Sequence, residues 1–126
     1  MRVGYVDTSC LVAIEFGEKG GRGMSRRFKD FDELVSANLL EAERRAAFRR
    51  EGVVEPPGSH IAVSWIIPDR PLSPEIGRVL TAGYVRGADC WHLATALYLA
   101  EDPSELVFLT LDARQKDVAL ALGFGT

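Results

Sequence analysis

The start of the chain places the strongest constraint on the fold, because a short apolar run there passes directly into a carboxylate and then into a helix. Residues 2–6 predict a strand that ends at Asp7. Thr8 and Ser9 then begin an apolar stretch with helical spacing, which we expect to run to about Gly17. A buried strand that carries a carboxylate to its own carboxyl end often builds the floor of an active site.

Length and composition indicate an ordinary globular protein. A chain of 126 residues suits one domain, residues 1–126, with a core of its own. No apolar run approaches the ~18 residues that a membrane span needs, and the N-terminus has no signal-peptide pattern. Two cysteines, Cys10 and Cys90, do not form a disulfide framework, so we expect a cytoplasmic protein with reduced thiols.

Strand and helix patterns alternate along the whole chain. Strands that are separated by helices predict a mainly parallel sheet with helices on both faces, so the expected fold is a three-layer α/β/α domain of Rossmann-like type. We expect a glycine-rich break at residues 17–23, a proline-containing loop at 53–59 and an unstructured end at 123–126. The expected strands are residues 2–6, 33–36, 60–67 (a buried strand) and 106–111, and the expected helices are residues 8–17, 24–31, 37–51, 73–82, 89–100 and 112–122.

Three aspartates are expected at one edge of this sheet. Asp112 repeats the pattern of Asp7, since a buried run ends at a carboxylate and a helix follows, and Asp89 begins another helix. Each aspartate alone is equally well explained as a helix N-cap. Carboxyl ends of parallel strands share one edge, however, and neighbouring strands lie only about 4.8 Å apart. Two carboxylates at this distance repel each other unless one is protonated or a cation lies between them. Oxygen ligands favour Mg²⁺ or Mn²⁺ as that cation.

A fourth carboxylate is expected from the helix at residues 37–51, where Glu41 and Glu43 are the candidates. The two lie roughly 200° apart around the helix. Glu41 has a polar face and is expected at the surface, paired with Arg44 or Arg45. The neighbours of Glu43 at three and four positions are Leu39, Leu40, Ala46 and Ala47. A charge on this apolar, inward face needs a metal or water beneath it, so we select Glu43.

Several other side chains allow both a structural and a functional interpretation. His92 lies one turn after Asp89, so it either faces the site or packs as a neutral residue against a neighbour. We expect Cys10 and Cys90 to be small buried hydrophobic residues. The tryptophans, Trp65 and Trp91, are expected in the core, and His60 is expected to be structural or at the surface.

Basic residues form two clusters, and the net charge of −3 argues against a general nucleic-acid coat protein. The clusters are either solvated helix faces or surfaces that hold RNA phosphates or an acidic partner segment. Arg86 is the best placed single arginine, because it lies just before Asp89. The clusters are Arg22, Arg26, Arg27 and Lys29, and Arg44, Arg45, Arg49 and Arg50.

Four motifs in order resemble those of PIN-domain ribonucleases, and most closely the VapC-type toxins of prokaryotic toxin–antitoxin pairs. The resemblance covers nearly the whole chain and implies a PIN-like fold. It rests on Val6-Asp7-Thr8-Ser9, on the segment from Ser36 to Glu43, on Arg86-Gly87-Ala88-Asp89 with His92-Leu93-Ala94-Thr95-Ala96, and on Thr110-Leu111-Asp112. The acidic positions of the family correspond to Asp7, Glu43, Asp89 and Asp112, and the polar positions that orient the site to Thr8, Ser9 and Thr110. The family's serine-to-glutamate spacing fits neither Glu41 nor Glu43, and the helical face decides for Glu43.

The resemblance implies a metal-dependent endoribonuclease. Carboxylates would position Mg²⁺ or Mn²⁺, which lowers the pKa of a bound water that attacks an RNA phosphodiester. It also implies a VapB-type antitoxin as partner, a homodimer and no membrane association. Arg86, Arg44 and Arg45 are the candidate contacts to RNA or antitoxin.

Two other functions compete with this one. A phospho-receiver domain is also doubly wound and binds Mg²⁺, but it needs an acid pair after the first strand, where Val6 precedes Asp7, and a lysine at a strand end, whereas Lys116 is expected within a helix. A non-catalytic interaction module with the PIN fold is the second alternative. The presence of all four acids argues against that module.

Overall fold

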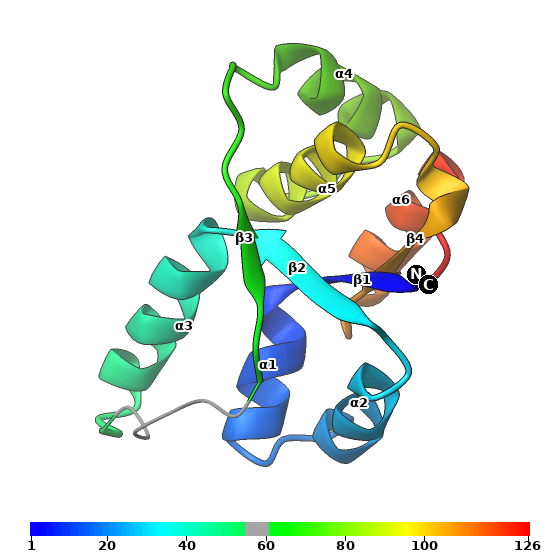
Figure 1. Cartoon of the computed structure of the whole chain (residues 1–126). Helices are drawn as coiled ribbons and strands as arrows, with labels where there is room; N and C mark the ends of the chain where they lie inside the picture. Colours follow the sequence, from blue (N-terminus) through cyan, green and yellow to red (C-terminus); the bar gives the residue numbers. More distant parts are fainter. Residues whose placement is uncertain (55–60) are drawn as a thin grey trace.

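The computed structural model describes residues 1–54 and 61–126, which form a parallel four-stranded sheet between two layers of helices (Figure 1). The order of strands in the sheet is β3-β2-β1-β4. The expected α/β/α fold is confirmed. The strands are β1 (Val3–Val6), β2 (Glu33–Ala37), β3 (Ser64–Ile66) and β4 (Leu106–Leu109), and the helices are α1 (Thr8–Glu15), α2 (Gly21–Phe28), α3 (Leu39–Arg50), α4 (Ser73–Ala82), α5 (Gly87–Leu99) and α6 (Ala113–Leu122), with a 3₁₀ turn η1 (Pro103–Glu105).

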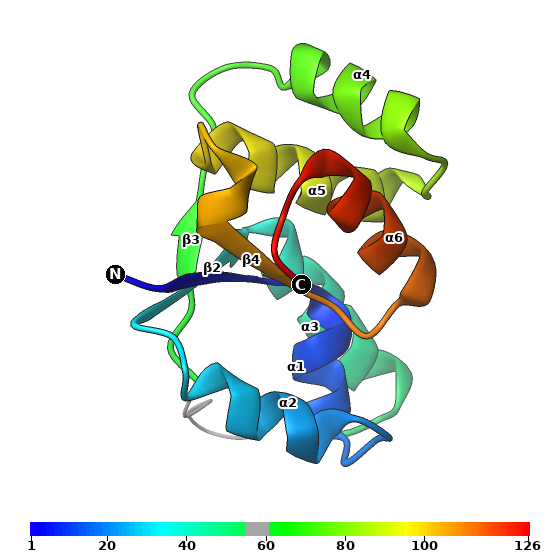
Figure 2. The ribbon, with the colours of Figure 1, turned by 90° about the vertical axis from the view of Figure 1, so that its right-hand side faces the viewer.

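Each face of the sheet has its own hydrophobic core. Successive residues of a strand point to opposite faces, so Tyr5 of β1 and Phe108 of β4 pack with α4, α5 and α6. Val6 and Leu109, the next residue of each strand, pack with α1, α2 and α3. Figure 2 shows the layer of α4, α5 and α6 above the sheet and the layer of α1, α2 and α3 below it. The central strands are therefore buried on both sides, which explains their continuous apolar runs.

The register of the sheet brings two strand ends together. Val6 at the end of β1 pairs with Leu109 at the end of β4. The N–H of Asp7 donates to the carbonyl of Leu109 at 2.9 Å, so the pairing continues one residue past β1. The prediction that these strands are neighbours is confirmed.

A strand was expected at residues 60–67, of which the structure describes residues 61–67, and most of these are not in a strand. Only Ser64–Ile66 pairs, with β2, and Trp65 is 39% exposed. The expectations of a buried strand and of Trp65 in the core are wrong, because β3 is the edge strand with a neighbour on one side only. His60 and the proline-containing part of the preceding loop lie outside the described residues.

Other boundaries also differ from those expected. Helix α2 begins at Gly21 rather than at residue 24, and α5 begins at Gly87, so Asp89 lies inside its first turn rather than before it. The expected unstructured C-terminus is wrong. Gly123 has a left-handed backbone (φ 100°) that ends α6 and turns the chain back, and the carbonyl of Gly125 accepts the N–H of Phe108 at 2.7 Å.

Within the described residues, no helix is long and apolar enough to cross a membrane.

Candidate acidic site

The four expected site carboxylates line one cleft of about 500 Å³ at the carboxyl edge of the sheet. We call this the acidic cleft, and its carboxylates are Asp7, Glu43, Asp89 and Asp112. They come from the end of β1, from α3, from the first turn of α5 and from the residue before α6. Glu41 does not reach it; its carboxylate is exposed and lies 3.8 Å from the guanidinium of Arg45 on the next turn. The helical-face argument therefore selected the glutamate that lies in the cleft.

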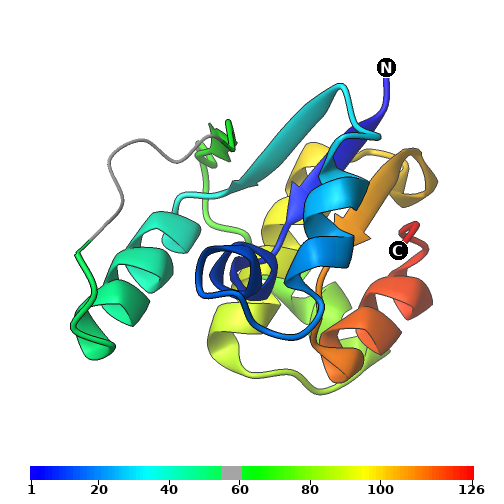
Figure 3. The same cartoon turned by 90° about the horizontal axis from the view of Figure 1, so that it is seen from below.

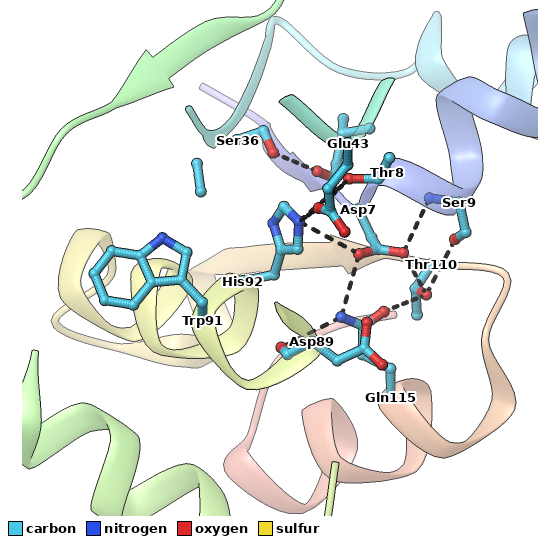
Figure 4. A network of polar contacts seen from close by, with 12 residues as sticks. Asp7, Thr8, Ser9, Ser36, Glu43, Asp89, Trp91, His92, Thr110 and Gln115 are labelled. Atoms are coloured by element: carbon cyan, nitrogen blue, oxygen red, sulfur yellow. Dashed lines mark hydrogen bonds and ion pairs between the residues drawn. The ribbon is translucent and has the colours of Figure 1, made fainter. Parts of the chain in front are cut away.

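Asp7 is both a helix cap and a wall of the cleft. Its side chain is nearly inaccessible, with the residue 4% exposed. One carboxylate oxygen, Oδ2, accepts the N–H of Ser9 at 3.1 Å and so caps α1. The other oxygen, Oδ1, lies 3.3 Å from the side-chain amide of Gln115 (Figure 4). The two interpretations of Asp7 from the sequence are thus compatible.

Gln115 is a site residue that the sequence interpretation missed. It is fully buried, and its amide Nε2 faces Asp7 while its Oε1 accepts the hydroxyl of Thr110 at 2.6 Å. A signal was present, because Gln115 shares one helical stripe with Val118, Ala119 and Leu122. A polar residue on such a stripe requires polar partners inside the protein. Asp7 and Thr110 are those partners.

Ser9 and Thr110 fix the loop that follows β4. The N–H of Leu111 donates to the hydroxyl of Ser9, and the N–H of Asp112 donates to the hydroxyl of Thr110, both at 3.1 Å. The first bond ties the loop to the first turn of α1, and the second lies within the loop. They give both hydroxyls a positioning role beside Asp7.

Asp89 and Asp112 complete the acidic side of the cleft. Asp112 is exposed and caps α6 by accepting the N–H of Gln115 at 2.8 Å. Asp89 is partly buried, and burial, followed by the charges of Asp7 and Asp112, raises the pKa of its carboxyl group. The cleft therefore concentrates negative charge, as the strand-end argument predicted.

Glu43 is held by two neighbours. Its Oε1 accepts the hydroxyl of Thr8 at 2.8 Å and lies 2.7 Å from Nε2 of His92. Burial raises the pKa of Glu43, but the hydrogen bonds from His92 and Thr8 and the attraction to His92 outweigh it, so the pKa is lowered. Glu43 is thus held as a carboxylate.

His92 joins this cluster to the core. It is 1% exposed. The hydroxyl of Tyr5 accepts the N–H of Ala37 at 3.0 Å and forms a hydrogen bond with Nδ1 of His92 at 2.8 Å. A carboxylate only accepts, so Nε2 of His92 donates its proton to Glu43. His92 therefore packs in the core, as the structural interpretation predicted, and it contacts the cleft residue Glu43 without lining the cleft itself.

The expected arginine contacts separate into different environments. Arg44 forms a bidentate ion pair with Glu15 at 2.6 Å and lies over the ring of Phe48, so it joins α1 to α3 inside the protein. This internal pairing removes Arg44 as a candidate contact to RNA or antitoxin. Arg45 is exposed beside Glu41, and Arg86 is exposed at the start of α5. Both cysteines are buried, and Trp91 packs partly buried against the core, as expected.

The donor chemistry of the cleft fits a hard divalent cation, because four carboxylates line one space and oxygen atoms are the ligands that such ions prefer. The present side-chain orientations do not converge on one point. Across residues 1–54 and 61–126, no group of three or more acidic, histidine or cysteine side chains is arranged to hold an ion. Glu43 is turned toward His92 instead.

Comparisons of the chain with known protein families, with curated proteins and with solved structures found no match.

Proposed function

We propose that the protein is a metal-dependent endoribonuclease of the PIN-domain type. The observation that carries the proposal is the meeting of Asp7, Glu43, Asp89 and Asp112 in one cleft, although they are spread over the chain. Their order and surrounding motifs are those that resemble the family. An oxygen-lined, negatively charged cleft is the kind of site that holds Mg²⁺ or Mn²⁺ for phosphodiester hydrolysis.

The residues divide into ligands and supports. Asp7, Asp89 and Asp112 would hold the metal, with Glu43 joining them directly or through water. When bound, the ion lowers the pKa of a water molecule and stabilises the charge that develops on the phosphate. Gln115 and the N–H of Ser9 orient Asp7, as Figure 4 shows. Thr8 and His92 hold Glu43 deprotonated, and Thr110 positions Gln115.

We further propose a biological role as a VapC-type toxin that is neutralised by a VapB-type antitoxin, in the cytoplasm and as a homodimer. This role is supported by the resemblance of the motifs rather than by the geometry of the cleft. The neighbouring reading frame tests it, since a small gene for a DNA-binding antitoxin is expected next to this one.

Cleavage of total RNA tests the catalytic proposal. We expect cleavage with Mg²⁺ or Mn²⁺ and none in EDTA; cleavage that continues undiminished in EDTA contradicts the metal mechanism. Asp7→Asn and Asp89→Asn should each lower the rate by more than about 100-fold, beyond the ~10–100-fold typical of residues that only support a ligand. Asp102→Asn is the matched control, because Asp102 caps the 3₁₀ turn η1 outside the cleft. Equal activity of all three variants would place the chemistry elsewhere.

A further inference from the structure

A second cleft of about 510 Å³ lies beside the acidic cleft and shares two of its carboxylates. It is lined by Tyr84, Arg86, Asp89, Asp112 and Arg114, and we call it the arginine–tyrosine cleft. Asp89 and Asp112 belong to both clefts, so a ligand can contact both at once. In Figure 3 the connector from α4 to α5, which carries Tyr84 and Arg86, passes beside the start of α6.

The connector is held firmly in this place. A Cβ atom at Gly83 would come within 2.9 Å of the side chain of Val118, so the backbone lies directly on α6. Val85 is 4% exposed and belongs to the core. The two residues that alternate with them, Tyr84 and Arg86, are exposed. The packing therefore presents both side chains outward at a fixed position.

Tyr84 presents an open aromatic surface beside two cations. The residue is 68% exposed, and the guanidinium of Arg114 lies 5.9 Å from its ring centroid. Among the described residues, no carboxylate forms an ion pair with Arg86 or Arg114, although Asp89 and Asp112 line the same cleft. An exposed tyrosine and two arginines that form no ion pair with any described carboxylate are the kind of groups that bind a base and its phosphates.

We propose that the arginine–tyrosine cleft binds an unpaired nucleotide of an RNA strand, next to the phosphate that lies in the acidic cleft. The base stacks on Tyr84, and Arg86 and Arg114 contact the flanking phosphates. An unpaired strand fits because a base within a duplex cannot offer its face to a side chain. The inference rests on the proposed ribonuclease function and specifies where its substrate strand enters or leaves.

Binding of short fluorescein-labelled oligoadenylate and oligouridylate tests the proposal. The binding protein is the Asp7→Asn variant in Mg²⁺, which avoids cleavage, and fluorescence anisotropy is the readout. We expect Tyr84→Ala to weaken oligoadenylate binding by roughly 10-fold, and Tyr84→Phe to change it by less than about 2-fold, because a phenyl ring still stacks. Oligoadenylate should lose more than oligouridylate, since adenine has the larger ring surface.

The salt dependence of binding separates a phosphate contact from general charge. Arg114→Gln should lower the slope of log affinity against log salt by about 0.7. Lys116→Gln is the matched control, because Lys116 is exposed on the same helix roughly 200° around from Arg114. An equal loss in both variants, or full binding by Tyr84→Ala, overturns the proposal.

A parallel cleavage assay with the natural sequence keeps the two proposals apart. If RNA is cut in a metal-dependent way while substitutions of Tyr84 and Arg114 leave binding unchanged, the arginine–tyrosine cleft is not the strand site and the ribonuclease function stands. If oligonucleotides bind through Tyr84 but no RNA is cut, the cleft stands and the catalytic proposal fails. Failure of Asp7→Asn to bind either oligonucleotide rejects the cleft as a nucleic-acid site.

Discussion

Glu43, His92 and Tyr5 form a continuous chain of hydrogen bonds from the acidic cleft to the backbone of β2. The N–H of Ala37 is hydrogen-bonded to the hydroxyl of Tyr5, this hydroxyl to Nδ1 of His92, and Nε2 of His92 to the carboxylate of Glu43. Tyr5 and His92 are almost fully buried, so neither can replace a lost partner with water. Removing one member therefore leaves an unsatisfied polar group inside the protein.

Tyr5→Phe should lower the free energy of unfolding by about 1–3 kcal/mol, because the N–H of Ala37 and Nδ1 of His92 both lose their partner. Urea unfolding measures the change. Tyr98→Phe is the control, since its hydroxyl donates to Asp69 at the exposed surface at 3.0 Å, and it should cost less than about 0.5 kcal/mol. Equal losses in the two variants would show that the buried chain contributes no special stability.

Glu43→Gln should reduce RNA cleavage more than Glu41→Gln does. The first substitution removes a charge from the acidic cleft, while the second removes an exposed charge 3.8 Å from Arg45. We expect at least a 10-fold loss for Glu43→Gln and a change of less than about 2-fold for Glu41→Gln. Initial rates on one RNA at saturating Mg²⁺ decide this, and the opposite ranking rejects Glu43 as the site glutamate.

At the scale of elements, the contact between α1 and α2 depends on one small residue. A Cβ atom at Gly21 would lie 2.4 Å from the carbonyl oxygen of Ala13, and backbone cannot move aside as a side chain can. Gly23, two residues later in α2, has nothing within 4 Å of the corresponding position. Substitution by alanine is therefore expected to have opposite effects on stability at these two positions of the same helix.

Gly21→Ala should destabilise the protein by about 1–3 kcal/mol through overpacking. Gly23→Ala should stabilise it by about 0.5–1 kcal/mol, because alanine favours a helix and loses less entropy on folding. Thermal or urea unfolding of both variants measures the difference. A loss of stability in both would mean that the space beside Gly23 is not open.

Elements whose burial leaves a hydrophobic pattern in their own sequence could be predicted from the sequence. The apolar runs of β1 and β4, each followed by an aspartate, were found because burial on both faces leaves a pattern in the strand itself. The face of Glu43 followed from helical periodicity in the same way. The short length and edge position of β3 and the return of Gly125 to β4 were missed, because both depend on which distant segment lies alongside.

The parts of the site that were missed are also long-range. Gln115 contacts Asp7 across more than 100 residues of sequence, and Arg44 pairs with Glu15 from another helix. Neither partner is visible from spacing, which reports only on residues of one element. Asp7, Asp89 and Asp112 could be found because each lies at or near an end of its own element, where local signals are strong. Glu43 could be found because helical periodicity places it on the apolar face of α3.

At the scale of the whole molecule, each of the two cores contains one thiol, Cys10 below the sheet and Cys90 above it. Cys10 is fully buried, and its N–H donates to the carbonyl of Asp7 at 3.1 Å. Burial, followed by the charge of Asp7, raises the pKa of the Cys10 thiol from 9.0 to about 12. Burial also raises the pKa of Tyr5, on the opposite face of β1, well above its ordinary value. Burial therefore disfavours negative charge both in β1, at Tyr5, and in the first turns of α1, at Cys10.

These shifts predict that the protein loses stability in alkaline solution. The folded state binds both protons more tightly than the unfolded state, so their contribution is complete below the ordinary pKa of 9.0 for Cys10 and falls as the pH rises toward about 12. Each group lowers the free energy of unfolding by up to about 1.4 kcal/mol per pH unit in that window. Urea unfolding between neutral pH and about pH 11 measures the slope, and Cys10→Ala should make it shallower even if it weakens the core at every pH. Equal slopes for Cys10→Ala and the natural sequence would show that the Cys10 thiol does not titrate differently in the folded protein.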